Sequence, residues 1–260
     1  MSVRDLPLLE VRDLAKSYGD LQALKPTGFD LWPGEVLAIV GESGSGKTTL
    51  LSCLAGHVPA DGGSVRFRLR NGEDVDLLQM AEAERRLLAR TEFGLVHQNP
   101  RDGLRLNISA GGNIGERLMA VGWRHFGRIR AEALAWLDRV EIDRSRVDDL
   151  PRAFSGGMQQ RLQIARNLVT RPRLVLMDEP TGGLDVSVQA RLLDLLRRLV
   201  AELDLAVVIV THDLAVARLL SHRMLVMRRG QVVEQGLTDR VLDDPQHPYS
   251  QLLVSSILAA

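Results

Sequence analysis

Three short apolar runs are the clearest feature of the hydrophobic pattern along the chain. They cover residues 35–40, 173–178 and 205–210 and are rich in valine, isoleucine and leucine. Strands buried on both faces of a parallel sheet show this continuous pattern. Helical spacing of apolar residues follows these runs or precedes them, at about residues 47–56, 157–170 and 186–203. Alternating strands and helices predict an α/β layer architecture.

The pattern changes elsewhere along the chain. Residues 8–18 and 63–70 alternate between apolar and polar positions, which predicts antiparallel strands in an edge layer. Residues 99–156 show helical patterns but no good buried strand, so we expect a helical insertion there. The tail, 237–258, carries two short helical patterns.

Composition narrows the class of protein. The 260 residues are 45% hydrophobic and 25% charged, which is typical of a folded globular chain. The 33 basic residues balance the 33 acidic ones, so we expect no nucleic-acid partner. No apolar run approaches about 18 residues, which argues against membrane insertion. The first eleven residues lack an apolar signal core, so we expect a cytoplasmic protein.

Cysteine usage excludes several kinds of site. Cys53 is the only cysteine in the chain. An intramolecular disulfide, a zinc ribbon and a cysteine-ligated iron–sulfur cluster all need more than one. The candidate chemistry of this chain therefore lies in phosphate-binding and acidic motifs.

A glycine-rich segment follows the first apolar run. Residues 41–48 fit the pattern G-x-x-x-x-G-K-[ST] between a predicted strand and a predicted helix, which favours a phosphate loop over an incidental turn. Its backbone N–H groups would turn toward phosphate oxygens. Lys47 would hold the β- and γ-phosphates, and the Thr48 hydroxyl would hold Mg²⁺. The predicted nucleotide-binding residues here are Gly41, Ser43, Gly44, Ser45, Gly46, Lys47, Thr48 and Thr49.

Two carboxylates end the second apolar run. Asp178 and Glu179 precede Pro180, and the carboxyl ends of parallel strands are where α/β sheets bind ligands. We expect Asp178 to bind the metal, directly or through water. Glu179 would act as the general base on the attacking water. The alternative is a plain acidic turn before the proline, which the neighbouring phosphate loop makes less attractive.

A third motif lies just upstream of the acidic strand. Residues 154–161, FSGGMQQR, resemble the signature segment of ABC-type ATPases, with Phe154 in place of the usual leucine and Met158 in place of a polar residue. Other matches follow the order of that family, and each also has an ordinary structural interpretation. Gln98 resembles the Q-loop glutamine, His212 the switch histidine, and Tyr18 the aromatic residue that stacks on adenine. The D-loop match has these residues: Gly183, Leu184 and Asp185.

The resemblance implies a fold and a mechanism. It implies a single P-loop NTPase domain over 1–260, with a RecA-like core and antiparallel β layer at about 1–98 and 157–260. It also implies a helical subdomain at about 99–156 and a C-terminal helical tail at 237–260. Two such domains, identical or paired with another ABC ATPase, would sandwich each ATP head to tail.

The resemblance also assigns roles to residues. Glu179, His212 and Gln98 would be catalytic, and Thr48, Gln98 and Asp178 would hold Mg²⁺. The signature would contact the ATP of the partner chain, because the N-terminal end of the helix near residue 157 favours an anion. Its residues are Ser155, Gly156, Gly157 and Gln159. Gly183, where serine or alanine is commoner, would loosen the D-loop around Asp185.

Three kinds of ABC ATPase remain open. The tail at 244–253 is similar to importer ATPases for oligopeptides and nickel, which would couple to a membrane permease. The sequence of residues 97–119, together with the signature and D-loop sequences, is similar to the ATPases associated with the bacterial carbon–phosphorus lyase. That similarity implies a dimer docked on the soluble lyase core during phosphonate breakdown. An ATP-driven clamp on nucleic acid is disfavoured by the single cassette and the balanced charge.

A basic surface is the candidate contact for the lyase core. Residues 80–94 predict a short helix with three arginines, and two further arginines follow Gln98. The alternative is a solvated helix face balanced by Glu82 and Glu84. The candidate contacts are Arg85, Arg86, Arg90, Arg101 and Arg105.

Overall fold

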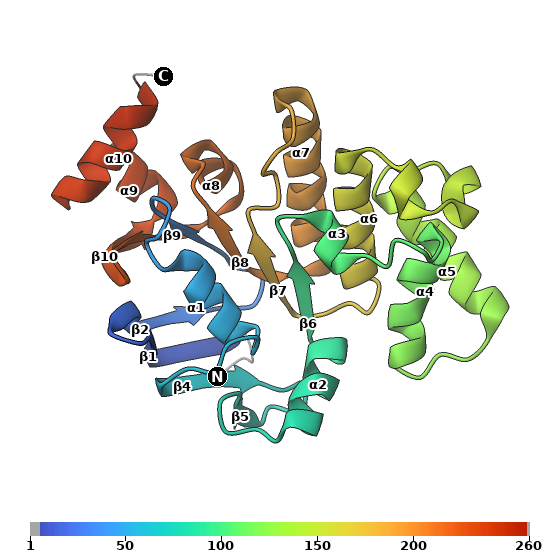
Figure 1. Cartoon of the computed structure of the whole chain (residues 1–260), viewed down its shortest axis with the longest axis horizontal. Coiled ribbons are helices and arrows are strands. Elements are labelled where there is room, and N and C mark those ends of the chain that lie inside the picture. The colour runs from blue at the N-terminus through green and yellow to red at the C-terminus, as the bar shows by residue number, and fades with distance from the viewer. Residues whose placement is uncertain (1–5, 259–260) are drawn as a thin grey trace. The chain divides into compact units, whose positions relative to one another are not determined.

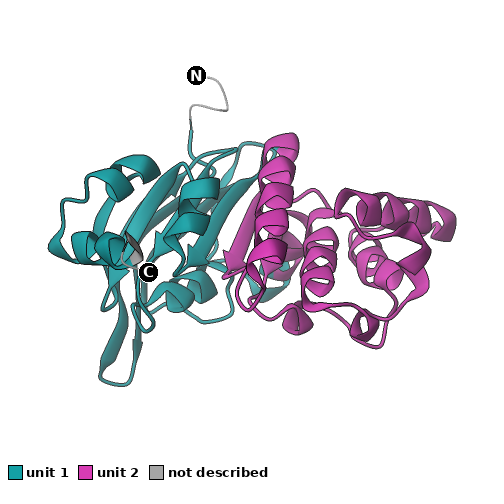
Figure 2. Cartoon of the chain, turned by 90° about the horizontal axis from the view of Figure 1, so that it is seen from above, with its two compact units in different colours: residues 1–85, 204–260 teal, residues 86–203 magenta. Residues whose placement is uncertain are grey.

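The computed structural model describes residues 6–258 in two compact units (Figure 2). The first unit joins residues 1–85 to residues 204–260, and the second covers residues 86–203. The chain passes from the first unit to the second within the helix α2 (Glu82–Thr91). The mixed α/β class expected from the hydrophobic pattern is confirmed.

An antiparallel sheet forms one layer of the first unit, as the alternating pattern predicts. Its four strands run in the order β2-β1-β4-β5, and neighbours pair antiparallel. Side chains of β1 alternate between buried and more exposed positions over its first residues. The bounds of the strands are β1 (Leu9–Tyr18), β2 (Leu21–Leu31), β4 (Gly62–Arg68) and β5 (Asp74–Asp76).

A second group of strands in the first unit carries the buried runs. The order is β10-β9-β3-β8, with β3 paired in parallel to both β9 and β8. All residues of β3 and β8 are buried, which explains their unbroken apolar sequence. The strand bounds are β3 (Val36–Val40), β8 (Ala206–Thr211), β9 (Arg223–Arg228) and β10 (Gln231–Leu237).

Three helices of the first unit, α1, α8 and α9, each follow a strand, and α10 follows α9. The helix after β3 begins directly at the end of the glycine-rich segment, and two helices form the predicted tail, drawn in red near β10 in Figure 1. Their bounds are α1 (Lys47–Leu54), α8 (Leu214–Leu220), α9 (Thr238–Asp243) and α10 (Pro248–Leu258). The expectation of two short tail helices is confirmed.

The second unit contains one parallel pair of strands, β6 (Phe93–Val96) and β7 (Leu174–Asp178). Between them the chain is helical, and no strand occurs in residues 99–156, all of which the structure describes. The helices are α3 (Pro100–Gly103), α4 (Ala110–Ala120), α5 (Phe126–Arg139), the 3-10 turns Arg144–Asp148 and Pro151–Ala153, α6 (Gly156–Leu168) and α7 (Val186–Leu203). Trp136 of α5 is buried, as are Ile114 and Leu118 of α4, and these two helices pack against each other.

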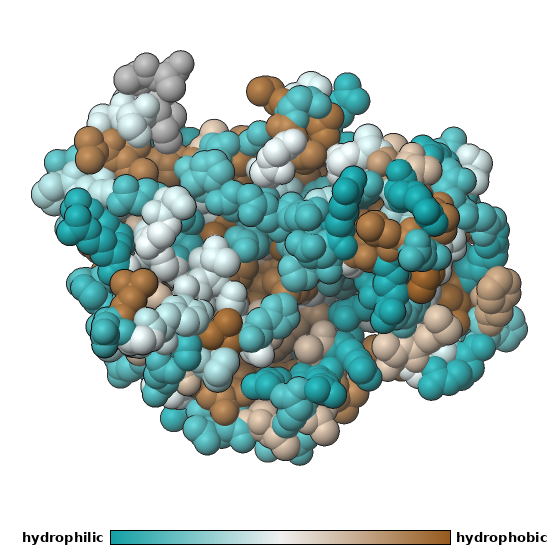
Figure 3. All heavy atoms as spheres, viewed as in Figure 1, coloured by the Kyte–Doolittle hydropathy of each residue, from teal (hydrophilic) through white to brown (hydrophobic). Residues whose placement is uncertain are grey.

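The surface shows no large apolar area on the face drawn in Figure 3. Hydrophobic side chains form small separate groups there, one of them over α10 beside the grey terminal residues. Leu252 of α10 is one of the exposed large apolar residues, with 64% of its surface exposed. Within residues 6–258, no helix combines the length and the apolar character needed to cross a membrane.

Candidate functional site

The glycine-rich segment wraps from the end of β3 into α1, in the strand–turn–helix context that its motif requires. Gly46 precedes α1 with a φ of 101°, and a Cβ there would lie 2.5 Å from the Ala23 carbonyl oxygen. A Cβ on Gly41 would lie 2.2 Å from the Met227 carbonyl oxygen. Both approaches are too close for any side chain, so these positions require glycine.

Lys47 is the buried cation of this loop. Its side chain is only 6% exposed. The ammonium donates to the Gly41 carbonyl at 2.7 Å and to the Glu42 carbonyl at 2.9 Å, and it lies 3.4 Å from the Ser45 hydroxyl. A compact group with three donors suits three converging oxygens. The chain thus holds a positive charge inside the loop, beside the exposed Ser43 and Gly44.

The acidic strand brings two predicted catalytic residues together within the second unit. Gln98 follows β6, and Glu179 follows β7, the parallel neighbour of β6. The Gln98 Nε2 group donates to Glu179 Oε2 at 3.1 Å. Glu179 has a φ of 40°, an uncommon conformation for a residue other than glycine. Such strain concentrates at functional sites, which agrees with the role expected for Glu179.

The signature segment forms the start of α6. The Ser155 hydroxyl accepts from the Met158 N–H at 3.3 Å, so Ser155 caps the helix. A Cβ on Gly157 would lie 2.5 Å from Val188 Cγ1, which favours glycine there. Ser155 and Gly156 are exposed at the helix N-terminus, where backbone N–H groups favour an anion.

Gln159 serves the segment differently from its neighbours. Its side chain is buried, and its Nε2 group donates to the carbonyls of Pro151 and Phe154 at 3.0 and 3.1 Å. These bonds tie α6 to the turn before the signature. Gln159 was predicted to contact the ATP of the partner chain, but its side chain binds backbone carbonyls of its own chain and stabilises the signature segment.

Asp185 shapes the D-loop in the same local way. Its Oδ1 atom accepts from the Val188 N–H at 2.9 Å and from the Ser187 hydroxyl at 2.8 Å, at the start of α7. The Val188 N–H, followed by the Ser187 hydroxyl, lowers the pKa of Asp185. Gly183 has a φ of 74° and open space around it. The D-loop therefore turns at a left-handed glycine and ends in a charged helix cap.

Two further predicted residues lie in the first unit. His212 follows β8 and is exposed, directly before Asp213, which caps α8. Tyr18 ends β1 with half of its surface exposed, and the Lys16 ammonium lies 5.6 Å from its ring centroid. An exposed ring at a strand end can stack on a ligand, as the prediction for Tyr18 requires.

The predicted metal donors offer the oxygen ligands that Mg²⁺ takes from a protein. Mg²⁺ in phosphate-transfer sites takes only one or two carboxylates or hydroxyls from the protein. Thr48 lies in the first turn of α1 and is exposed, and Asp178 ends β7 in a half-buried position. Their hydroxyl and carboxylate oxygens are the hard ligands that this ion prefers. Among residues 6–258, no cluster of three or more His, Cys, Asp or Glu side chains could hold a metal alone.

Comparison with known families decides the class of protein. The family described as ABC transporter matches residues 24–182, more than half of the chain. The chain belongs to the ABC family. It is an ATP-hydrolysing enzyme with the fold of an ABC nucleotide-binding domain, as its sequence motifs indicate.

This ABC ATPase has similar proteins both among known sequences and among solved structures. The phosphonates utilization ATP-binding protein PhnK of Escherichia coli K12, as it is named, is 67% identical over 97% of this chain and 98% of its own length. The oligopeptide transport ATP-binding protein OppD of Bacillus subtilis is 37% identical over 98% of this chain and 73% of its own. The ATP-binding cassette MJ0796, solved as a dimer bound to ADP and Pi, gives a TM-score of 0.78 at 29% identity, covering 88% of this chain and 98% of that one.

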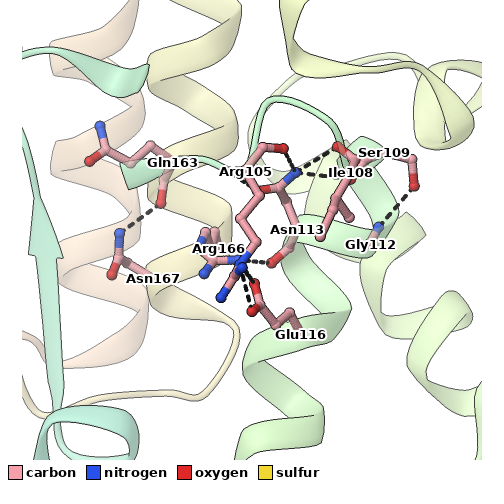
Figure 4. Close-up of polar contacts among 9 residues, drawn as sticks. All are labelled: Arg105, Ile108, Ser109, Gly112, Asn113, Glu116, Gln163, Arg166 and Asn167. Carbon is pink, nitrogen blue, oxygen red and sulfur yellow. Dashed lines mark hydrogen bonds and ion pairs between the residues drawn. The ribbon is translucent and has the colours of Figure 1, made fainter. Parts of the chain in front are cut away.

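In this ABC ATPase, a side chain of α4 holds the backbone of residues 105–109 by hydrogen bonds (Figure 4). Asn113 of α4 is fully buried. Its Nδ2 group donates to the carbonyls of Arg105, Ile108 and Ser109 at 3.0, 2.8 and 3.1 Å, and its Oδ1 atom accepts from the Arg105 N–H at 2.8 Å. One side chain therefore sets the path of residues 105–109.

Glu116, one turn further along α4, extends this network (Figure 4). Its carboxylate accepts from Arg105 and Arg166, each at 2.8 Å, and Arg166 also donates to the Asn113 carbonyl at 2.6 Å. Burial opposes the charge of Glu116, but hydrogen bonds from Arg166 and Arg105 outweigh it and lower the pKa of this carboxyl. Arg105, a predicted partner contact, is thus held in place while 60% of its side chain stays exposed.

The other predicted partner contacts differ in their surroundings. Arg85 forms an ion pair with Glu82 one turn earlier on α2. Arg86, Arg90 and Arg101 are exposed at the surface. The structure therefore keeps Arg86, Arg90 and Arg101 accessible, and Glu82 partly balances Arg85.

Proposed function

We propose that this ABC ATPase docks as a dimer on the carbon–phosphorus lyase core and couples ATP hydrolysis to phosphonate breakdown. The observation that carries the proposal is 67% identity, over nearly the full length of both chains, to a protein named for phosphonate utilization. The choice of the lyase core as the partner rests on the resemblance of residues 97–119 to lyase-associated ATPases.

The residues divide the chemistry among them. Lys47 and the loop amides would hold the phosphates of ATP, and Thr48 and Asp178 would hold Mg²⁺, which neutralises charge on the β- and γ-phosphates when bound. Glu179 would accept a proton from the attacking water. The Gln98 hydrogen bond would hold that carboxylate in one orientation. His212 would contact the γ-phosphate from the end of β8.

The position of the signature supports the proposed dimer. Ser155 and Gly156 are exposed at the N-terminus of α6, ready to face a phosphate on a second chain. The similar cassette MJ0796 has been solved as a dimer. We infer that two copies of this chain, or this chain and a related ATPase, bind two ATP molecules between them.

The docking surface would include the exposed arginines beside and after Gln98. Arg105 is held in place by Glu116, so little of its side-chain freedom is left to lose on binding. Arg86 and Arg90 lie four residues apart on α2 and share one helix face. A partner with an acidic surface would suit these groups.

Affinity capture of the tagged chain from cells grown on a phosphonate tests this function. We expect lyase core subunits in the eluate in amounts comparable to the bait. A double charge reversal, Arg86→Glu with Arg90→Glu, should reduce their recovery, while Arg197→Glu on α7 serves as a matched surface control. Recovery of a membrane permease without lyase subunits would overturn the proposal.

An importer role is the second candidate. It is favoured by 37–38% identity to the oligopeptide transport protein OppD of two organisms and to relatives named for peptide import. The same capture experiment separates the two roles, because both use the same catalytic residues and differ only in the partner.

A further inference from the structure

The C-terminal helix reaches the phosphate loop through one side chain. Tyr249, the second residue of α10, is 5% exposed. The Glu42 backbone N–H donates to the Tyr249 hydroxyl at 3.1 Å. Glu42 directly follows Gly41 and lends its carbonyl to the Lys47 ammonium. The Glu42 N–H shares its peptide group with the Gly41 carbonyl, which accepts from the Lys47 ammonium at 2.7 Å. Tyr249 therefore holds a peptide group that also contacts the loop lysine.

The start of α10 is itself anchored to β10. The Glu234 carboxylate accepts from the backbone N–H groups of Gln246 and His247 at 2.8 and 3.0 Å. His247 Nδ1 in turn accepts from the Tyr249 N–H at 3.1 Å. These bonds fix the first turn of the helix, so the Tyr249 ring has little freedom to leave the loop.

The turn between β9 and β10 binds the phosphate loop at Ser45, on the far side of the loop tip from Glu42. Arg228 ends β9 and places its guanidinium 4.8 Å from the centroid of the Tyr249 ring. Two residues later, the Gly230 N–H donates to the Ser45 carbonyl at 2.9 Å. Tyr249 and Gly230 therefore hold the loop at Glu42 and at Ser45, on either side of its exposed tip at Ser43 and Gly44.

We propose that Tyr249 is a positioning residue for the phosphate loop and that α10 is coupled to nucleotide binding through it. The hydroxyl satisfies the Glu42 N–H and holds the loop in the shape that receives phosphate. Coupling between two binding events is reciprocal. A docked α10 therefore raises the affinity for nucleotide, and bound nucleotide tightens the docking of α10.

Tyr249→Phe removes the hydroxyl and keeps the ring packed beside Arg228. One net hydrogen bond corresponds to about a two- to tenfold change in an equilibrium constant, so the Kd and KM for ATP should rise by about that factor. The kcat should change much less, because saturating nucleotide holds the loop itself. Ser255→Ala is the matched control, since it removes a hydroxyl from the same helix that bonds only to the Leu252 carbonyl among the described contacts.

Hydrogen exchange provides a readout that a purely structural role would not change. In the wild-type chain, a non-hydrolysable ATP analogue should slow amide exchange in residues 249–256. Tyr249→Phe should lose this protection although it still binds analogue at high concentration. Nucleotide-independent exchange of α10 in the wild type, or an unchanged Kd in Tyr249→Phe, would overturn the proposal. The wild-type measurement holds even if the variant folds poorly, and neither depends on the lyase.

Discussion

Lys47 is one of three lysines among 33 basic residues, the others being Lys16 and Lys25. Arginine carries the charge elsewhere, yet the phosphate loop retains lysine. The buried ammonium fits between the Gly41 and Glu42 carbonyls, a space that suits a point charge. A planar guanidinium has a different shape and a fixed set of donors. Geometry therefore explains why this position keeps the rarer residue.

Lys47→Arg should abolish most nucleotide affinity. The larger group cannot sit within 3 Å of both loop carbonyls without displacing the loop. Titration with a fluorescent ATP analogue measures the effect, and Lys25→Arg serves as the control because Lys25 lies outside the loop. Normal binding by Lys47→Arg would refute the role given to this ammonium.

Glu179→Gln should leave ATP binding intact and slow hydrolysis by about 10²–10⁴-fold, the usual contribution of a general base. The amide oxygen can still accept from Gln98, so the local structure should persist. Phosphate release under saturating ATP measures the rate, with the exposed Glu202→Gln as control. A wild-type rate in Glu179→Gln would show that another group takes the proton.

At the scale of elements, α4 supports the surface that follows Gln98. Asn113→Ala would leave the carbonyls of Arg105, Ile108 and Ser109 without their shared donor. The free energy of unfolding should fall by about 1–3 kcal/mol, the cost of leaving buried polar groups unpaired. Denaturant titration measures it, and Asn107→Ala at an exposed position should cost much less. Equal losses would contradict the importance of the network.

The sequence predicted elements best where burial alone determines the pattern. β3, β7 and β8 are continuous apolar runs, and all three were predicted close to their observed bounds. The pattern missed β2, which contains Pro26 and Gly28, residues that usually weaken a strand signal. It also missed β10, whose side chains are mostly half-exposed and partly polar.

Sequence motifs predicted which segments form the candidate site. They did not predict contacts that arise only when distant parts of the chain pack together. Residues 41–48 matched a known pattern and form the expected loop. Nothing in the pattern predicts that Gln159 binds its own backbone or that Tyr249 reaches Glu42, more than 200 residues away in sequence. Such contacts depend on tertiary packing, and an aromatic residue in an apolar helix ordinarily predicts a core position.

At the scale of the whole molecule, the proposed dimer depends on the exposed N-terminus of α6. Ser155→Arg would place a bulky side chain where the partner's phosphate should lie. In the Glu179→Gln background with ATP, light scattering should show a dimer, and Ser155→Arg should return it to a monomer. Ser145→Arg, on an exposed 3-10 turn, should leave the dimer intact. A dimer that survives Ser155→Arg would place the interface elsewhere.

The central claim concerns the partner that receives the work of ATP hydrolysis. Size-exclusion chromatography with light scattering, using purified lyase core, the Glu179→Gln chain and ATP, tests it most directly. The proposed function predicts one peak that contains the core and two copies of this chain, and a loss of that peak when ATP is omitted or Lys47 is replaced. Separate elution of the core and the ATPase under all conditions would contradict it.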